Sequence, residues 1–460
     1  MASDTRDDPP IAGNRGSEPA STKPTNHVIT VRSDPGVVLV GQSIAGDLDG
    51  DGTDDLVLLA LELRDGQFED IDNLKTTAHV FYGRAELPTT LQLGDADARV
   101  RGQGLGFLWG TLGAHALGDL NGDGLADLLL AAPDEACFIF GNEVRLSGEV
   151  EVEDVAVRWS FDVDPLGPRL ASVIAAGDVQ GDGLSDVILV FEPTQPLGAP
   201  PTGASVPMSF LFAGQRTPWP SRFDQTSATA VFSGPDAGKG IRAVDAGDLD
   251  GDGRADLLFN DGGVSRIFPG SRFDAVGTIN VSGAEALSAG QLDVRVVDDL
   301  NGDGIDELGW RSTGNTISLQ YGTSVAPPAE RHAPDLVIAA GGISLRHLMT
   351  IDFDGDGADE LALPTPSAPN FPGGLYLVTQ EQLRKSTRID VNQHQPLLQW
   401  HETHFSDEGR PLDADLLISV GTGGDVTGDG VHDVAAVIVS NTGGQPLESY
   451  ATIIPGSYSP

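Results

Sequence analysis

Short apolar runs separated by glycine- and aspartate-rich turns follow one another along most of the chain. One type of run precedes each turn, as at 37–45, and a second follows it, as at 56–60. A third run often ends in a glycine, as at 79–83, and a fourth, more polar run comes next, as at 97–101 or 150–157. None keeps a 3.6-residue period, so each predicts a β-strand.

A nine-residue pattern, Asp-x-x-Gly-Asp-Gly-x-x-[Asp/Glu], separates the first and second runs of each unit. It recurs about every 63 residues, and a fixed period of this kind indicates a repeat architecture. With four strands in each unit, seven units predict an all-β fold, a seven-bladed β-propeller of antiparallel blades. The seven copies occupy residues 47–55, 119–127, 178–186, 248–256, 299–307, 352–360 and 425–433.

The two ends of the chain suggest how the ring closes. The seventh unit ends after its third strand, whereas residues 27–32 alternate like a strand and precede the first unit. We predict that this N-terminal strand completes the last blade, so that no sheet edge is left open. Residues 27–460 would then form one propeller domain, and residues 1–26, rich in Pro, Ser, Asp and Gly, a disordered tail.

The repeated turn has the composition of a calcium loop. Oxygen-bearing side chains occupy positions 1, 3, 5 and 9, the carbonyl of position 7 is free to point inward, and calcium takes six to eight oxygen ligands. The glycines permit the positive φ angles of a tight turn. Magnesium is disfavoured because it retains its waters, and the absence of Cys and His from these positions argues against zinc or copper. A metal-free Asp-Gly turn would explain one copy, but seven copies favour metal.

The predicted ligands therefore number five in each of seven loops, for up to seven Ca²⁺ ions. They are Asp47, Asp49, Asp51, Thr53 and Asp55; Asp119, Asn121, Asp123, Leu125 and Asp127; Asp178, Gln180, Asp182, Leu184 and Asp186; Asp248, Asp250, Asp252, Arg254 and Asp256; Asp299, Asn301, Asp303, Ile305 and Glu307; Asp352, Asp354, Asp356, Ala358 and Glu360; and Asp425, Thr427, Asp429, Val431 and Asp433.

The loops differ in charge at position 3. Those of the first, fourth and sixth units offer four carboxylates, whereas the other four offer three. Because affinity for calcium falls with the number of charged ligands, we expect the loops with Gln180 and Thr427 to bind most weakly.

The segment 118–133, with its Ala-Ala-Pro ending, resembles the FG-GAP repeats of integrin alpha-subunit propellers and their bacterial relatives. The resemblance extends over essentially all of 27–460. It implies a seven-bladed propeller with calcium loops between the first two strands of a blade, on the lower face. Integrins carry such loops in only some blades, whereas here every unit has one, and no subunit partner is implied by this chain.

Composition narrows the classes of partner. The chain has 68 acidic and 27 basic side chains among 460 residues, a formal net charge of −41. Such a charge repels nucleic acids and anionic lipid surfaces. No apolar run is long enough to cross a bilayer, so membrane insertion is not expected. Positions 1, 3, 5 and 9 of the seven loops hold 24 of the carboxylates, so part of the negative charge is predicted to bind metal ions.

No motif for catalysis stands out, and we predict a binding protein that is not an enzyme. Cys137, the single cysteine, lies in an apolar run and is expected to be a core residue. The only histidine cluster, His394, His401 and His404 with Glu402, lacks the spacing of zinc peptidases.

We expect a ligand on the face opposite the calcium loops. Long or aromatic connections lie there, although the favoured interpretation of their aromatic residues is that they fill gaps between blades. They span 61–76, 102–113, 159–164, 192–207 and 397–415.

The sequence thus favours a monomeric extracellular or cell-surface adhesion module that binds a protein or a glycan. No signal peptide is visible in this chain. Two alternatives remain open, a calcium-dependent carbohydrate-active enzyme similar to polysaccharide lyases and a purely structural surface protein.

Overall fold

The computed structural model describes most of the chain between Val28 and Gly456. The described residues are 28–62, 76–102, 113–133, 135–160, 168–193, 207–216, 218–220, 222–234, 241–261, 264–273, 277–281, 284–287, 292–312, 316–324, 334–339, 348–365, 374–394, 396–399, 404–405, 411–442 and 448–456. The predicted tail, 1–26, lies outside them.

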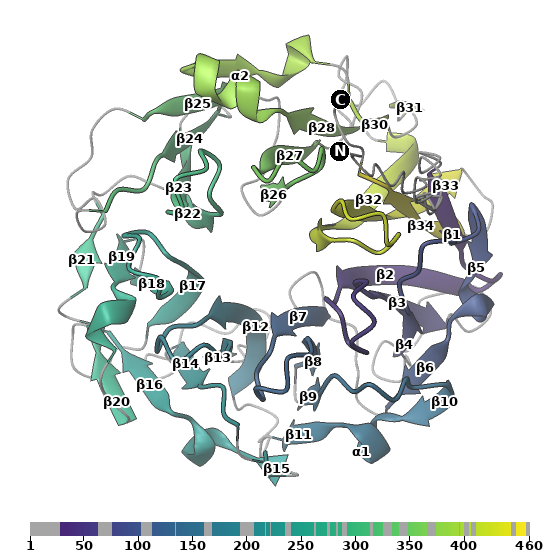
Figure 1. Ribbon diagram of the computed structural model, residues 1–460, viewed down its shortest axis with the longest axis horizontal. Coiled ribbons are helices and arrows are strands. Elements are labelled where there is room, and N and C mark those ends of the chain that lie inside the picture. Colours follow the sequence, from purple (N-terminus) through teal and green to yellow (C-terminus); the bar gives the residue numbers. More distant parts are fainter. Residues whose placement is uncertain are drawn as a thin grey trace, which may run out of the picture.

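Seven antiparallel sheets form a ring, which confirms the predicted seven-bladed β-propeller (Figure 1). The first strand of each blade is innermost and the fourth lies toward the rim. In chain order the blades comprise β2 (Val37–Ile44), β3 (Leu56–Glu62), β4 (Thr76–Phe81) and β6 (Ala98–Arg101); β7 (Ala114–Gly118), β8 (Asp127–Ala132), β9 (Glu135–Ile139) and β11 (Val157–Ser160); β12 (Pro168–Gly177), β13 (Asp186–Pro193), β14 (Met208–Phe212) and β16 (Ala230–Ser233); β17 (Arg242–Gly247), β18 (Asp256–Asp261), β19 (Val264–Phe268) and β21 (Glu285–Ala286); β22 (Leu292–Val297), β23 (Glu307–Ser312), β24 (Thr316–Gln320) and β25 (Leu336–Ala339); β26 (Met349–Ile351), β27 (Glu360–Thr365), β28 (Gly374–Val378) and β30 (Leu398–Gln399); and β32 (Pro411–Gly424), β33 (Asp433–Thr442), β34 (Glu448–Ile454) and β1 (Ile29–Arg32).

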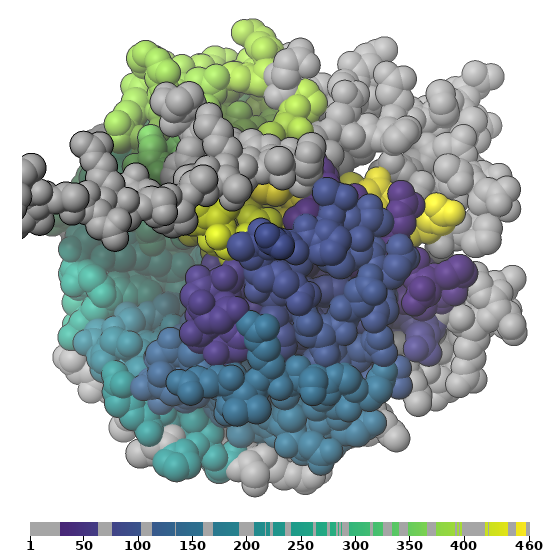
Figure 2. Space-filling model, turned by 45° about the vertical axis from the view of Figure 1, so that its right-hand side comes forward, coloured from purple at the N-terminus to yellow at the C-terminus, as the bar shows by residue number. Residues whose placement is uncertain are grey.

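The N-terminal strand closes the ring, as predicted. β1 pairs antiparallel with β34, with Ile29 opposite Ile453 and Val31 opposite Ala451. Ile29 and Val31 are buried in the same apolar cluster as residues of blades 1 and 7. In Figure 2 the purple N-terminal residues adjoin the yellow C-terminal ones on the surface. The last blade therefore joins the two ends of the chain.

Among the described residues, a fifth, parallel strand extends five of the blades, and the sequence did not predict it. In each case the connection between the third and fourth strands of one blade pairs with the outer strand of the preceding blade. This covers an otherwise unpaired edge and links neighbouring blades. The pairs are β5 (Thr90–Gln92) with β1, β10 (Gly148–Glu151) with β6, β15 (Arg222–Phe223) with β11, β20 (Gly277–Asn280) with β16 and β29 (Arg388–Asp390) with β25.

The predicted strand 150–157 is therefore wrong in its bounds. Residues 148–151 form β10, which pairs with blade 1, and α1 (Val152–Val155) follows it. The true fourth strand of blade 2 is β11, which pairs with β9. A run of alternating apolar residues cannot show which of two neighbouring sheets it joins.

The apolar core lies largely between adjacent blades. Trp159, which the sequence suggested to lie in a loop, belongs to β11 and is fully buried. Its ring meets Phe191, Phe210 and Phe212 of blade 3 edge-on, with centroids 4.8 to 6.3 Å apart. The expectation that the connecting aromatic residues fill gaps between blades is confirmed for Trp159. Cys137 on β9 is also buried, as expected.

Helices are few in the described part of the chain. Besides α1 there is α2 (Gln380–Lys385), which follows β28 at the rim. Among the described helices, none has the length and apolar character needed to cross a membrane.

Candidate metal centre

Every copy of the acidic pattern forms the hairpin between the first and second strands of its blade, as predicted. We number these hairpins 1 to 7 by blade; hairpin 1, at 47–55, joins β2 to β3. Its glycines at positions 4 and 6, Gly50 and Gly52, have φ angles of 78° and 88°. A side chain is strained in this region, which explains the two fixed glycines.

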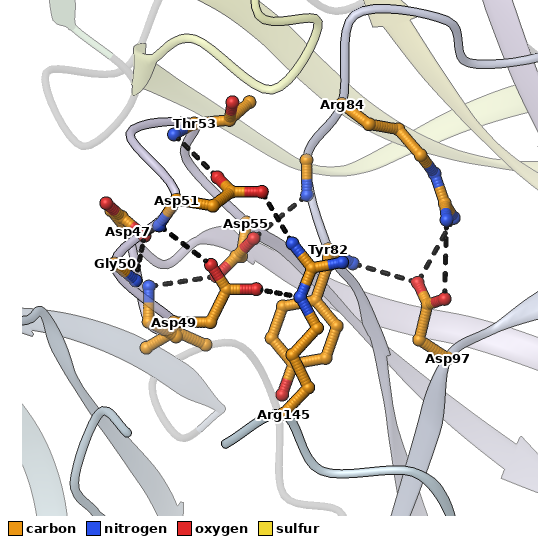
Figure 3. Close-up of polar contacts among 12 residues, drawn as sticks. Asp47, Asp49, Gly50, Asp51, Thr53, Asp55, Tyr82, Arg84, Asp97 and Arg145 are labelled. Atoms are coloured by element: carbon orange, nitrogen blue, oxygen red, sulfur yellow. Dashed lines mark hydrogen bonds and ion pairs between the residues drawn. The ribbon is translucent and has the colours of Figure 1, made fainter. Parts of the chain in front are cut away.

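The acidic side chains of hairpin 1 are held by the backbone of the same hairpin (Figure 3). Asp47 accepts hydrogen bonds from the N–H of Gly50 at 2.6 Å and of Gly52 at 2.8 Å, and Asp51 accepts one from Thr53 at 2.9 Å. Hairpin 3 repeats the pattern. The carboxylates are therefore oriented by the turn before any ligand arrives.

The position-9 carboxylates are the most deeply buried of the set, at most 2% exposed. In hairpin 1, Asp55 accepts hydrogen bonds from the N–H of Leu48 and of Gly83, both at 2.9 Å. Burial raises the pKa of Asp55, despite these bonds, to about 7. The same burial raises the pKa of Asp127, Asp186, Asp256, Glu360 and Asp433 to about 7 and of Glu307 to about 9.

These buried carboxyl groups predict an unusual pH dependence for the metal-free protein. Their folded-state pKa lies above the unfolded value near 4, so their contribution to stability is full below about pH 4 and is lost as the pH rises through about 7. In chelator, we expect the melting temperature to fall by roughly several degrees from pH 6 to pH 8. Calorimetric scans at both pH values measure this. A higher melting temperature at pH 8 would contradict it.

The glycine that follows many third strands has a structural reason. In five blades its N–H donates to the position-9 carboxylate, as Gly141 does to Asp127 at 2.9 Å. A Cβ on Gly141 would lie 2.5 Å from the carbonyl oxygen of Ala126 and 2.6 Å from the Cβ of Leu125. The third strand thus packs directly on its hairpin, and only glycine fits there.

The substitution Gly141→Ala tests this close approach. The added methyl group would meet a backbone carbonyl, so we expect the free energy of unfolding to fall by about 2–3 kcal/mol. Urea denaturation measures the change. Gly94→Ala is the matched control, since its Cβ would have only the Arg99 guanidinium nearby, at 3.9 Å. Equal stability of the two variants would argue against the tight contact.

Consecutive hairpins are also hydrogen bonded to one another. The N–H at position 8 donates to the position-1 carbonyl of the preceding hairpin at 2.8 to 3.0 Å. Of the seven junctions, five show this bond in the described residues, and the junction between blades 7 and 1 is one of them. The donors and acceptors are Asp54 to Asp425, Ala126 to Asp47, Ser185 to Asp119, Ala255 to Asp178 and Asp306 to Asp248. An ordered hairpin therefore supports its neighbours in the ring.

The structure brings carboxylates together most closely in hairpins 1, 4 and 6, the three that have four carboxylates. In each, oxygens of three residues lie within 4.8 Å of one another: Asp47, Asp49 and Asp55; Asp248, Asp250 and Asp256; and Asp352, Asp354 and Asp356. Ligand oxygens bound to one calcium at 2.3–2.6 Å are at most about 5.2 Å apart. The spacing and the all-oxygen donor set therefore fit calcium.

In three of the other four hairpins, the position-3 side chain donates a hydrogen bond to a neighbouring carboxylate. Asn121 donates to Asp123 at 3.0 Å, and Asn301 donates to Glu307 at 2.9 Å. In hairpin 7, Thr427 donates to Asp433 at 3.3 Å. An acidic side chain at this position would instead add a negative charge, so these hairpins offer the weaker set of donors.

Much of the predicted ligand face lies outside the described residues. Most of the connections 61–76, 102–113 and 192–207 lie outside them, as do His401 and Glu402. His404 lies on the short strand β31 (His404–Phe405).

A pocket of 210 Å³ lies beside the end of β14 and is lined by residues that include Phe212, Gln215 and Trp219. The Trp219 ring stacks on Phe138 of blade 2, so it also fills the junction between blades 2 and 3.

With the hairpin geometry established, sequence comparison identifies one unit directly. Residues 116–143, from β7 to just beyond β9, match the family model described as FG-GAP repeat. Residues 116–143 are thus similar to an FG-GAP repeat. The match spans hairpin 2 and the strands on both sides of it, which confirms the resemblance drawn from 118–133. No curated protein is detectably similar to this chain in sequence.

Solved structures that are similar to this chain cover most of its length at low identity. BBS1N, in complex with ARL6DN, is 10% identical with a TM-score of 0.43, covering 94% of this chain and 98% of BBS1N. The BP39L lectin of Burkholderia pseudomallei is 10% identical with a TM-score of 0.41, covering 90% and 97%. An Agrocybe aegerita lectin that recognises non-reducing terminal N-acetylglucosamine is 12% identical with a TM-score of 0.36, covering 92% and 93%.

Proposed function

We propose that this protein is a calcium-binding, integrin-like propeller that acts as an extracellular binding or adhesion module. The observation that carries the proposal is the repetition of one acidic hairpin at the same place in all seven blades, with its position-9 carboxylate buried each time. A buried carboxylate costs free energy unless a cation or proton neutralises it. Bound ions, up to one in each hairpin, would offset these costs at one end of the ring.

Calcium is the ion that these donors suit best. Side-chain oxygens at positions 1, 3, 5 and 9 and the position-7 carbonyl would hold it, in up to seven hairpins. Bound calcium would supply charge neutralisation and hold the turns in place, and its role would be structural. Affinities in the range of extracellular calcium modules would suffice for this.

A protein or glycan ligand would bind on the face opposite the hairpins, with the protein as a monomer. The hairpin end is expected to be occupied by metal and by contacts between blades, which leaves the longer connections at the other end to vary. The net charge of −41 disfavours nucleic acid as the ligand.

A binding screen tests the proposed role. The chain is applied to glycan and extracellular-protein arrays, once with calcium and once with chelator. We expect selective binding that is lost in chelator and that survives Trp219→Phe, because the pocket beside Trp219 lies away from the proposed face. Loss of binding in Trp219→Phe would show that the ligand binds in the pocket and not on the proposed face. Formation of unsaturated sugar products would indicate a lyase. The absence of binding to any probe would favour a structural protein.

A further inference from the structure

An arginine from blade 2 lies on the acidic hairpin of blade 1. After β9, the chain crosses to hairpin 1, where the N–H of Asn142 donates to the carbonyl of Leu48 at 2.7 Å. Three residues later, the guanidinium of Arg145 forms ion pairs with both Asp49 and Asp51 (Figure 3). Asp49 is buried, with a side chain only 2% exposed, and belongs to the close carboxylate group of this hairpin.

The position of Arg145 is fixed from two further directions. Its guanidinium carbon lies 4.9 Å from the centroid of the Tyr82 ring, in the geometry of a cation–π contact. The Tyr82 hydroxyl in turn accepts a hydrogen bond from the N–H of Leu146 at 2.8 Å. The cation is therefore held against the carboxylates by its own neighbours, unlike a mobile surface arginine.

Other hairpins receive an arginine differently. Arg216 of blade 3 donates to the carbonyl of Gly122 in hairpin 2 at 3.1 Å, and Arg384 of blade 6 donates to the carbonyl of Asn301 in hairpin 5 at 3.2 Å. Both contact the backbone and leave the carboxylates free for an ion.

Hairpin 4 is the natural comparison for hairpin 1. Both begin Asp-Leu-Asp-Gly-Asp-Gly, and both group the carboxylates of positions 1, 3 and 9. In the part of the chain that the structure describes, no basic side chain pairs with Asp248, Asp250, Asp252 or Asp256. Apart from the guanidinium of Arg145, the two hairpins differ at positions 7 and 8, where the side chains of Arg254 and Asp54 lie against the neighbouring hairpins 3 and 7.

We propose that Arg145 is a built-in counter-cation of hairpin 1 and sets its calcium affinity below that of hairpin 4. This inference rests on the proposed calcium binding. Calcium affinity rises with the negative charge of the ligand set. A guanidinium bonded to two of the four carboxylates removes one unit of that charge, and a divalent ion entering the hairpin meets its repulsion at short range. Hairpin 1 therefore fills at a higher calcium concentration than hairpin 4.

Hydrogen–deuterium exchange of the full chain, titrated with free calcium, resolves each hairpin separately. The midpoint for protection of the peptide covering 47–55 is expected at roughly tenfold higher calcium than that covering 248–256. Arg145→Gln, which keeps most of the side chain but removes its charge, should lower the first midpoint by about tenfold and leave the second unchanged. Arg216→Gln is the matched control and should change the first midpoint by less than about twofold.

An unchanged or higher midpoint for hairpin 1 in Arg145→Gln would overturn the proposal, since Arg145 would then be neutral or would help to orient the ligands. The midpoint of hairpin 4 in the same sample shows that the variant is folded. If no hairpin gains protection with calcium, the proposed calcium binding itself fails, and this outcome is distinct from the failure of Arg145.

Discussion

Calcium is expected to raise the melting temperature of this protein by more than about 10 °C relative to the same protein in chelator. A ligand that binds only the folded state contributes about 2.7 kcal/mol per site at a hundredfold excess over its Kd. Seven hairpins share that benefit, and hydrogen bonds join neighbouring hairpins in the ring. Bound calcium would also neutralise buried carboxylates such as Asp55 and Asp256. Differential scanning calorimetry in calcium and in chelator measures the shift.

Magnesium at the same concentration is the control for a general effect of ionic strength. Because magnesium gives up its waters reluctantly and demands octahedral geometry, it should restore only a small part of the shift. Superimposable melting curves in calcium and in chelator would show that the hairpins are stable without an ion.

The second large effect concerns closure of the ring. Val31→Asp is expected to lower the free energy of unfolding by more than about 4 kcal/mol, because it buries an unpaired carboxylate. Val31 is fully buried on β1, opposite Ala451 of β34. The substitution should therefore separate the strand that joins the two ends of the chain. Chemical denaturation followed by intrinsic fluorescence measures the loss.

Val28→Asp is the matched control, since it makes the same change three residues earlier, at a side chain that is 45% exposed. We expect it to change stability by less than about 0.5 kcal/mol. If Val31→Asp were as mild as Val28→Asp, the pairing of β1 with β34 would not contribute to the stability of the folded ring.

The repeated features of this protein were predictable because repetition strengthens a weak local signal. A single Asp-Gly turn does not predict a fold. Seven copies at the same place between apolar runs predicted the blades, their hairpins and the incomplete last blade. The glycines of the hairpins follow from backbone sterics alone. Closure by β1 followed from the missing fourth strand.

Features that depend on which blade a segment meets were not predictable. The fifth strands are two to four residues long, and their pairing with the preceding blade leaves no periodic trace in the sequence. Trp159 looked like a loop residue because the phenylalanines that bury it lie 32 or more positions away. Arg145 pairs with Asp49 across 96 positions, and only the folded ring brings them together. The glycine after the third strand was visible in the sequence, but its cause, a carbonyl at the hairpin, was not.

The number of calcium ions bound per chain tests most directly whether the acidic hairpins are metal centres. Equilibrium dialysis against millimolar calcium, followed by elemental analysis, gives this number for the folded protein. We predict a value that approaches seven and falls by about one when Asp252→Ala and Asp256→Ala are combined in hairpin 4. One ion or fewer per chain, in protein that circular dichroism shows to be folded, would contradict calcium binding by the hairpins.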